Sequence, residues 1–404
     1  MERISLEQAI ERIKERIVPV CETLELELDQ ALGYILAEDI RAQISQPPFP
    51  RSPLDGYALR AADVQGASKD RPVTLRVIDK IMAGTVSKRM VERGTAVRLM
   101  TGAPIPVGAD CVIRQEDTDY GETDVQIYRE LRSQENICEE GEDFREGDLL
   151  LEKGDRLDAS VIGIAAGAGV TKVRVYRRPR VAVFCSGDEL QEPGTALAEG
   201  KIYDSSLAFI RAQLKEWDVE ITASGHFPDD PAVVGEAIDS AVGRADLILT
   251  TGGVSVGQKD IMHDVVRDLN GEQVFWRVAV KPGSPTLVFS YKGTIVICLT
   301  GNPYGTFANL ELLAGPVISR LARDPAMLPE KRRGVAVNEF RRRSGIRRIV
   351  KARYEDGRVT IPDAKQQSGV LSGLRGMNCL VDIPAEQDGV CAGEEVTVWM
   401  IGRR

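Results

Sequence analysis

Three short polar segments follow apolar, strand-like runs in the second half of the chain, and their residue types suit binding of an oxyanion and a cation. The segments are SGDE at 186–189, LTTGGVSVGQKD at 249–260 and GNP at 301–303. Glycines let a ligand approach the backbone closely, and free amides at a helix start bind phosphate and other oxyanions. The carboxylates of Glu189 and Asp260 are suitable ligands for a hard divalent cation that bridges to such an anion.

The elements around these segments predict how the segments are positioned. Apolar runs at 180–185, 219–225, 246–251 and 294–300 alternate with helical patterns at 204–217, 230–243, 260–269 and 302–321. This alternation predicts a parallel sheet covered by helices on both faces. Ligands of such sheets bind where the carboxyl ends of the strands meet helix starts. Asn302 suits an N-cap and Pro303 the first helical position, whereas Asp260 is either a helix N-cap or a Mg²⁺ ligand.

The segment 249–260 does not match two common nucleotide-binding motifs, because it lacks the Gly-Lys-Ser/Thr ending of a triphosphate loop and the spacing of a dinucleotide fingerprint.

Elsewhere, Ser5 and Gln8 predict a capping box at the start of an amphipathic helix. Asp158 is a plausible N-cap of a short helix. The sequence YEDGRV at 354–359 predicts a hairpin within a C-terminal β-barrel or sandwich.

Composition narrows the class of protein. The chain has 404 residues, a net charge of −9 and a pI near 5.2, which predict several domains and a soluble cytoplasmic enzyme that binds neither nucleic acid nor membranes. The first residues do not resemble a signal peptide. The seven scattered cysteines favour reduced thiols. Because there are only two histidines, acid–base chemistry and metal binding are expected to depend on carboxylates. The basic stretch 331–353 is interpreted as a solvated edge strand, with docking of an acidic partner as the alternative.

Several motifs together resemble the molybdopterin molybdenumtransferase family, the MoeA or gephyrin E-domain proteins. The motifs are SPLDGYALRAAD (52–63), RLMTGAPIPVGADCVIRQEDT (98–118), GEDFREGDLLLEKGD (141–155), FCSGDEL (184–190), IYDSS (202–206), TTGGVSVGQKD (250–260), VKPGSP (280–285) and GNP (301–303). They occur in the family's order and span nearly the whole chain, so the resemblance is specific as a set.

The resemblance implies Mg²⁺-dependent insertion of molybdate or tungstate into adenylylated molybdopterin, with release of AMP. It implies a homodimer, and further partners among cofactor-biosynthesis proteins or molybdoenzyme chaperones. The expected fold is multidomain α/β plus β, with a doubly wound, MogA-like α/β domain and a C-terminal β-barrel. The expected domains are a discontinuous helical/β linker and dimerisation domain at 1–44 and 143–177, an inserted β-rich domain at 45–142, the molybdopterin-binding α/β domain at 178–324 and the barrel at 325–404.

The motifs and the resemblance together yield the candidate site. Catalytic roles are expected for Asp55, Thr101, Asp143, Glu189, Asp260 and Lys281. Metal binding is expected at Glu189, Asp230 and Asp260. Substrate binding is expected at Gly252, Gly253, Ser255, Gly257, Arg277, Gly301, Asn302, Pro303 and Ser368. Asp55 and Asp230 also suit ordinary turns or helix caps, and Thr101 also suits a turn hydroxyl.

Some positions depart from the family pattern and motivate an alternative. The family usually has Asn-Ser-Ala-Met-Asp-Gly where this chain has RSPLDG, which places Arg51 and Pro53 in the loop. Cys138 or Glu139 stands where an arginine is usual, and Ser284 replaces a lysine. Thr300, Tyr304 and Gly305 alter the last polar loop. Cys138 is interpreted as a chance thiol or, alternatively, a sulfur ligand. These changes favour, as the alternative to an active transferase, a diverged molybdopterin-binding carrier. A pyrophosphatase or amidase that shares only the α/β domain is a third hypothesis, disfavoured by the motifs at 52–63 and 98–118.

Overall fold

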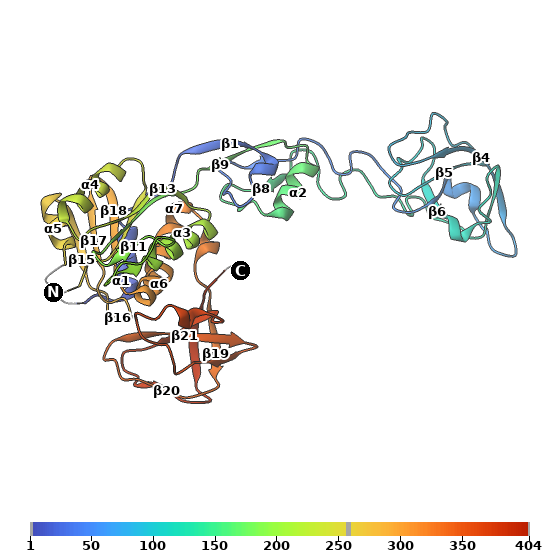
Figure 1. The fold of residues 1–404 in the computed structure, drawn as a ribbon. Helices are drawn as coiled ribbons and strands as arrows, with labels where there is room; N and C mark the ends of the chain where they lie inside the picture. Colours follow the sequence, from blue (N-terminus) through green and yellow to red (C-terminus); the bar gives the residue numbers. More distant parts are fainter. Residues whose placement is uncertain (1–2, 256–259, 403–404) are drawn as a thin grey trace. The chain divides into compact units, whose positions relative to one another are not determined.

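The computed structural model describes residues 3–255 and 260–402, and Figure 1 shows the course of the chain. The chain forms two compact units. One comprises the residues up to 24, residues 33–35 and the chain from 175 onward, and the other comprises 25–32 and 36–174. The finer division into four domains stays a prediction. Across the described residues, no helix has the length and apolar character needed to cross a membrane.

A six-stranded mixed sheet forms the centre of the first unit. In spatial order its strands are β13 (Glu220–Phe227), β10 (Arg180–Ser186), β14 (Leu247–Thr251), β18 (Thr294–Leu299), β17 (Leu287–Tyr291) and β15 (Glu272–Trp276). The first four are parallel, as predicted, whereas β17 pairs antiparallel with both of its neighbours, β18 and β15. The predicted parallel sheet is therefore confirmed for its four predicted strands, and β17 and β15 extend it at this edge. A hairpin turn, with positive φ at Lys292 (47°) and Gly293 (83°), joins β17 to β18 in place of a helix.

Helices cover both faces of this sheet, so the predicted doubly wound fold is confirmed (Figure 1). They are α1 (Leu6–Lys14), α3 (Ser205–Glu216), α4 (Pro231–Ala241), α5 (Met262–Asp268), α6 (Pro303–Asn309) and α7 (Gly315–Ala322). Alternate residues along a strand point to opposite faces. Val181 therefore packs in one apolar core with α1, α3, α6 and α7, whereas Ala182 packs in the other with α4 and α5.

Local signals explain where several of these helices begin and end. Ser5 forms the predicted capping box with Gln8 at the start of α1, and Asn302 is the N-cap of α6 with Pro303 in the first turn. The long helix predicted at 302–321 is interrupted by a π-helical turn at Leu310–Ala314. Pro316 lies two residues after that turn and has no backbone N–H to continue regular helical bonding, which accounts for the break.

The C-terminal part of the first unit is a closed β-barrel, as predicted. Its strands are β19 (Lys331–Ala336), β21 (Arg347–Glu355), β22 (Arg358–Thr360), β23 (Cys379–Ile383) and β25 (Glu395–Met400), and pairing of β21 with β23 closes the ring. The predicted hairpin is confirmed, with positive φ at Asp356 (47°) and Gly357 (77°) between β21 and β22. The short strand β16 (Val280–Lys281) extends from the α/β part and pairs with β21. Strands β20 (Phe340–Arg341) and β24 (Gly389–Val390) form a further pair.

The second unit is rich in short strands. A five-stranded sheet has the order β6 (Cys111–Arg114), β3 (Gly56–Leu59), β5 (Thr95–Leu99), β4 (Val73–Ile81) and β7 (Asp124–Ile127). Further elements of this unit include β2 (Ile40–Arg41), β8 (Leu149–Leu151) and α2 (Ala159–Gly167). Asp158 caps α2 as predicted. Two of the boundaries between the units fall within β1 (Thr23–Glu27) and β9 (Lys172–Tyr176), which pair with each other.

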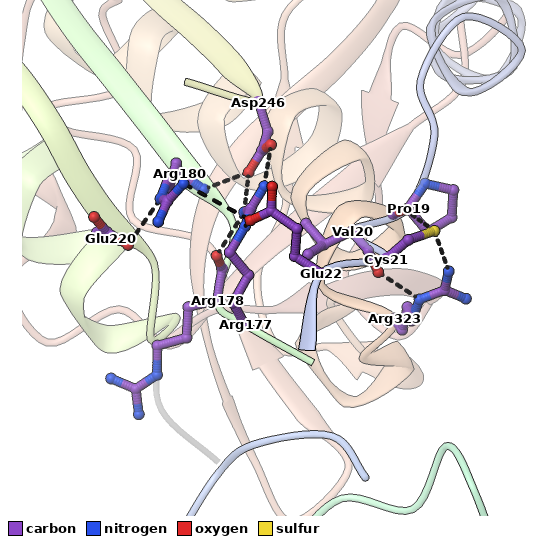
Figure 2. A network of polar contacts seen from close by, with 10 residues as sticks. All are labelled: Pro19, Val20, Cys21, Glu22, Arg177, Arg178, Arg180, Glu220, Asp246 and Arg323. Atoms are coloured by element: carbon purple, nitrogen blue, oxygen red, sulfur yellow. Dashed lines mark hydrogen bonds and ion pairs between the residues drawn. The ribbon is translucent and has the colours of Figure 1, made fainter. Parts of the chain in front are cut away.

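A network of ion pairs holds the end of this two-stranded ribbon to the α/β part within the first unit (Figure 2). The guanidinium of Arg177 donates to both carboxylate oxygens of Asp246, at 2.7 and 2.9 Å, and also pairs with Glu22. The backbone N–H of Arg180 donates to the same carboxylate at 2.7 Å. These contacts raise the pKa of Arg177, and the hydrogen bond with Asp246 is the largest cause. Charge and hydrogen bonding thus fix the start of β10 against β14.

Candidate active site

The three predicted polar loops meet at the carboxyl edge of the parallel strands. They follow β10, β14 and β18 and line one cavity of about 490 Å³. The predicted site residues that line it are Glu189, Gly252, Gly253, Ser255, Asp260, Gly301, Asn302 and Pro303. The short strands β11 (Leu190–Gln191) and β12 (Ile202–Tyr203) pair beside it and contribute further lining residues. Residues far apart in sequence thus form one polar cavity.

Two glycines allow the loop after β14 to pack against the loop after β10. Gly252 and Gly253 have φ values of +100° and +60°, which disfavour a side chain. A β-carbon on Gly252 would lie 2.1 Å from the carbonyl oxygen of Ser186, and one on Gly253 would lie 2.8 Å from Ile261 Cγ1. Glycine is therefore required for this close backbone approach. Gly257, also predicted to bind substrate, lies outside the described residues.

Asp260 closes the same loop and is not a helix cap. Helix α5 begins at Met262 with Ile261 as its N-cap, and that cap has no side-chain hydrogen bond. Instead, Asp260 Oδ1 accepts a hydrogen bond from the backbone N–H of Ser255 at 2.7 Å. Its second oxygen, Oδ2, is buried and has no hydrogen-bond partner within the described part of the chain. One carboxylate oxygen thus organises the loop while the other can accept a bond from a ligand or bind a cation.

Other carboxylates make the cavity acidic. Glu189, Asp204 and Asp229 also line it, and Asp204 Oδ2 and Asp229 Oδ1 are buried without a hydrogen-bond partner among the residues described. Such unfilled oxygens fit a hard cation. Across residues 3–255 and 260–402, however, no three His, Cys, Asp or Glu side chains are close enough together to enclose a metal. A Mg²⁺ ion here would therefore take further ligands from water and from an anionic substrate, as Mg²⁺ commonly does.

Two residues predicted for this site lie elsewhere. Asp230 does not line the cavity, because it is the N-cap of α4 and accepts hydrogen bonds from the N–H groups of Ala232 and Val233 at 2.8 and 3.3 Å. Asp229, its neighbour, lines the cavity instead. Sequence could have indicated this, since a helix that starts at Pro231 takes the preceding residue as its cap. Arg277 stacks on the ring of Trp276 at 4.2 Å and lines neither this cavity nor the one described next.

A second cavity, of about 840 Å³, lies between the α/β part and the barrel and is basic. The predicted residues Lys281 and Ser368 line it, and its other cationic lining residues are Arg3, Arg342, Arg343 and Arg348. Its described lining includes no carboxylate. It shares Pro285, Thr300 and Asn302 with the acidic cavity. An acidic and a basic cavity thus have a wall in common, which is hereafter the shared wall.

The basic stretch 331–353 divides between two environments. Arg341 is exposed and pairs with Glu339, which agrees with the interpretation as a solvated edge. Arg342, Arg343 and Arg348 instead line the basic cavity, and sequence reasoning missed them. Burial lowers the pKa of Arg348, and the charge of Arg342 lowers it further. Arg348 Nη2 donates to the carbonyl of Arg343 at 3.3 Å, whereas its Nε is buried without a hydrogen-bond partner in the described structure.

The remaining predicted residues belong to the second unit. Asp55 accepts hydrogen bonds from the backbone N–H and the hydroxyl of Thr101, at 2.7 and 2.8 Å. These two bonds lower the pKa of Asp55. Asp143 is exposed, and its backbone N–H donates to the carbonyl of Gln46 at 2.9 Å. The structure thus brings Asp55 and Thr101 into contact.

Two departures from the family pattern are coupled to each other. A β-carbon on Gly305 would lie 2.7 Å from Thr300 Cγ2, so the glycine leaves room for the threonine methyl group. The hydroxyl of Ser284 donates to the carbonyl of Val278 at 2.8 Å, and this bond is internal to the loop. Cys138 is buried and contacts the carboxylate of Glu142. The serine and threonine thus have structural partners in this chain.

The fold and the two cavities define a multidomain α/β protein whose polar site lies at the carboxyl ends of its parallel strands. Three family models match in order: the MoeA N-terminal region (domains I and II) at 4–169, a probable molybdopterin binding domain at 182–320 and the MoeA C-terminal region (domain IV) at 333–401. Together they extend over nearly the whole described chain.

Full-length relatives agree. A molybdopterin molybdenumtransferase of Staphylococcus epidermidis is 36% identical over 98% of this chain and 95% of its own, and one of Staphylococcus aureus is 33% identical over the same shares. The crystal structure of a molybdopterin biosynthesis MoeA protein from Pyrococcus horikoshii superposes with a TM-score of 0.84 at 28% identity, covering 99% of this chain and 100% of that one. The chain therefore belongs to the molybdopterin molybdenumtransferase family, a family of molybdenum cofactor biosynthesis, and is a transferase enzyme.

Proposed function

We propose that this enzyme inserts molybdate or tungstate into adenylylated molybdopterin, with Mg²⁺-dependent cleavage of the adenylate and release of AMP. One observation carries the proposal: a carboxylate-lined cavity at the sheet edge shares Pro285, Thr300 and Asn302 with a basic cavity. The proposed substrates suit this pair. A phosphate held with a cation fits the acidic cavity, and a free dianion fits the basic one.

In the acidic cavity, we propose that the adenylate phosphate lies against the glycine loops. Gly252, Gly253 and Gly301 line this cavity, and the close packing that Gly252 and Gly253 allow brings the loop backbone to its edge. Glu189 and Asp260 would hold Mg²⁺, and Asp229 replaces Asp230 as the third candidate because it lines the cavity. When bound, Mg²⁺ stabilises the negative charge that develops during phosphate cleavage. The carboxylates position the cation, and the loop fixed by Asp260 positions the phosphate.

In the basic cavity, we propose that the oxyanion is bound by Lys281, Arg348 and the hydroxyl of Ser368. Molybdate and tungstate are tetrahedral dianions, and cationic donors without a competing carboxylate attract them. The shared wall then lets the oxyanion approach the pterin end of a substrate whose phosphate is in the neighbouring cavity. Charge separation between the cavities keeps the free oxyanion out of the acidic one.

Asp55, Thr101 and Asp143 of the second unit also have a role in the proposed reaction. We propose that the enzyme acts as a cytoplasmic homodimer and that these residues complete the cleft of a partner copy. The pairing of Asp55 with Thr101 supports a preformed polar group. Light scattering of the purified chain tests the dimer, and a monomer at all concentrations would contradict it.

The experiment that tests the function is release of AMP from adenylylated molybdopterin in the presence of Mg²⁺, with molybdate and tungstate in parallel. Release that depends on one oxyanion supports the transferase and identifies its metal. Tight substrate binding without release would favour the carrier alternative. The carboxylates of Glu189, Asp229 and Asp260 in the acidic cavity support the transferase, since a carrier that only binds the pterin has no need of cation ligands.

A further inference from the structure

Lys351 has an unusual position for a lysine. It lies on β21 in the barrel, and its side chain is completely buried, with 0% exposed. Its Nζ donates to the carbonyl of Val370 at 2.7 Å and lies 3.9 Å from the centre of the Tyr304 ring. The ammonium group thus contacts one aromatic face and one backbone oxygen at the junction of the barrel and the α/β part.

If Lys351 served only to fill space in the barrel, its charged group would make it less favourable than an apolar side chain. Burial is the cause that lowers its pKa to about 8, so the folded protein disfavours the charged form. A methionine of similar length would fill the space without that penalty. The tertiary position of Lys351 therefore calls for an explanation other than stability.

On the barrel side, Lys351 contacts the segment 366–370, which contributes lining residues to both cavities. Its backbone exchanges hydrogen bonds with the side chain of Gln366, at 3.1 and 2.9 Å, and its Nζ binds Val370. These contacts hold both ends of the segment 366–370. Within that segment, Ser368 lines the basic cavity and Gly369 lines the acidic cavity.

On the α/β side, Lys351 contacts Tyr304, which lies close in sequence to Asn302 of the shared wall. Tyr304 is in the first turn of α6, two residues after Asn302, which lines both cavities. The backbone N–H of Tyr304 donates to the carbonyl of Ser368 at 2.9 Å, and its hydroxyl donates to the carbonyl of Ile349 at 3.0 Å. The ring of Tyr304 is thereby fixed between β21 and the segment 366–370.

We propose that Lys351 is a positioning residue for the transferase reaction: its ammonium group, held between the Tyr304 ring and the Val370 carbonyl, fixes the segment 366–370 against the start of α6 and so sets the geometry of the shared wall. This inference rests on the proposed function. It accounts for the buried charge, because a cation binds an aromatic face and a carbonyl oxygen together, which methionine does not do.

The main test compares Lys351→Met with the wild type. Thermal unfolding of the variant is expected at the same or a higher temperature, while kcat/KM for oxyanion-dependent AMP release falls on the order of tenfold, because small misplacements of substrate-binding groups are costly. Lys331→Met is the matched control, since Lys331 is an exposed barrel lysine 4.2 Å from the ring of Trp399. The control should keep full activity. Full activity of Lys351→Met would overturn the proposal.

A pH profile distinguishes positioning from packing. Among the described residues, Arg348 and Cys379 are, besides Lys351, the charged or titratable groups that act on the Tyr304 ring, and burial raises the pKa of Cys379 to about 12 and also raises that of Tyr304. Between pH 7 and 9, Lys351 is thus the group of this cluster that changes charge. The wild type should lose activity as pH rises through about 8, and Lys351→Met should lack this loss. Parallel profiles would contradict the proposal.

Hydrogen exchange provides a readout that does not need activity. Lys351→Met should increase amide exchange in 366–370 and at Tyr304, whereas Lys331→Met should not. Should Lys351→Met fail to fold, Tyr304→Leu removes the ring from the other side, and Tyr304→Phe keeps it as the control. If the wild type releases no AMP, the proposed function fails. The positioning role is then decided by exchange and molybdate affinity, and it is wrong if both are unchanged in Lys351→Met.

Discussion

Replacing Asp260 by asparagine separates the two roles that the structure assigns to its carboxylate. Oδ1 accepts the 2.7 Å hydrogen bond from Ser255, and asparagine keeps an oxygen for it. Oδ2 lacks a donor in the described structure, and asparagine replaces it by an uncharged NH₂ group. The free energy of unfolding should therefore change by less than about 0.5 kcal/mol. Loss of one charge at the proposed Mg²⁺ site should reduce AMP release on the order of 100-fold, or about 2.7 kcal/mol of transition-state stabilisation.

The assay follows AMP release by chromatography over a range of Mg²⁺ concentrations, with urea unfolding measured on the same preparations. Asp260→Ala also removes the acceptor for Ser255 and should lose about 1 kcal/mol of stability in addition. Asp230→Asn is the matched control, because asparagine is an equally good N-cap and Asp230 lies outside the cavity. Wild-type rates in Asp260→Asn, or a loss of activity in Asp230→Asn as large as in Asp260→Asn, would refute the reasoning.

Three further predictions concern stability. Arg177→Met leaves the carboxylate of Asp246 without its two guanidinium donors and should lower the free energy of unfolding by about 2–3 kcal/mol in urea titration. Gly305→Ala should destabilise by about 1–3 kcal/mol, mainly through contact with Thr300 Cγ2, and Thr300→Ser, which removes that methyl group, should restore part of the lost stability in a double-mutant cycle. Asp55 has a pKa below its ordinary 3.8, so its contribution to the free energy of unfolding is present above that pH and is lost as pH falls through the folded pKa. Acid unfolding of Asp55→Asn should lack this pH-dependent loss of stability.

The two cavities suggest how a single site can manage substrates with competing charges. Carboxylates that suit a cation repel a free oxyanion, and basic groups that attract an oxyanion repel the cation. Placing these groups in separate cavities that share Pro285, Thr300 and Asn302 avoids the conflict. Lys351 lies behind this shared wall, and its buried charge is consistent with a requirement for defined geometry there.

The basic stretch shows where sequence reasoning reached its limit. Strand periodicity indicates that neighbouring side chains point in opposite directions, but not what each direction faces. Arg341 faces solvent and a carboxylate, whereas Arg342 and Arg348 face a cavity. That difference arises only because the barrel packs against the α/β part, with β16 paired to β21. No pattern within the stretch itself carries this information.

The sequence by itself determined the local structure and the family. The capping box at Ser5, the N-cap at Asp158 and the hairpin at 356–357 depend on hydrogen bonds and φ angles within a few residues, and the start of α6 depends on the fixed φ of Pro303. Residue types at fixed spacing were therefore enough to predict them. The motif order identified the family for the same reason, since it is read along one dimension.

Only the tertiary structure decided which polar residues share a cavity. Asp229 and Asp230 are neighbours with the same chemistry, yet one lines the site and the other caps a helix. Lys351 looks like any strand lysine until the ring of Tyr304 and the carbonyl of Val370 surround it. The physical reason is that burial, cavity shape and pKa depend on atoms that are distant in sequence and meet only when the layers pack.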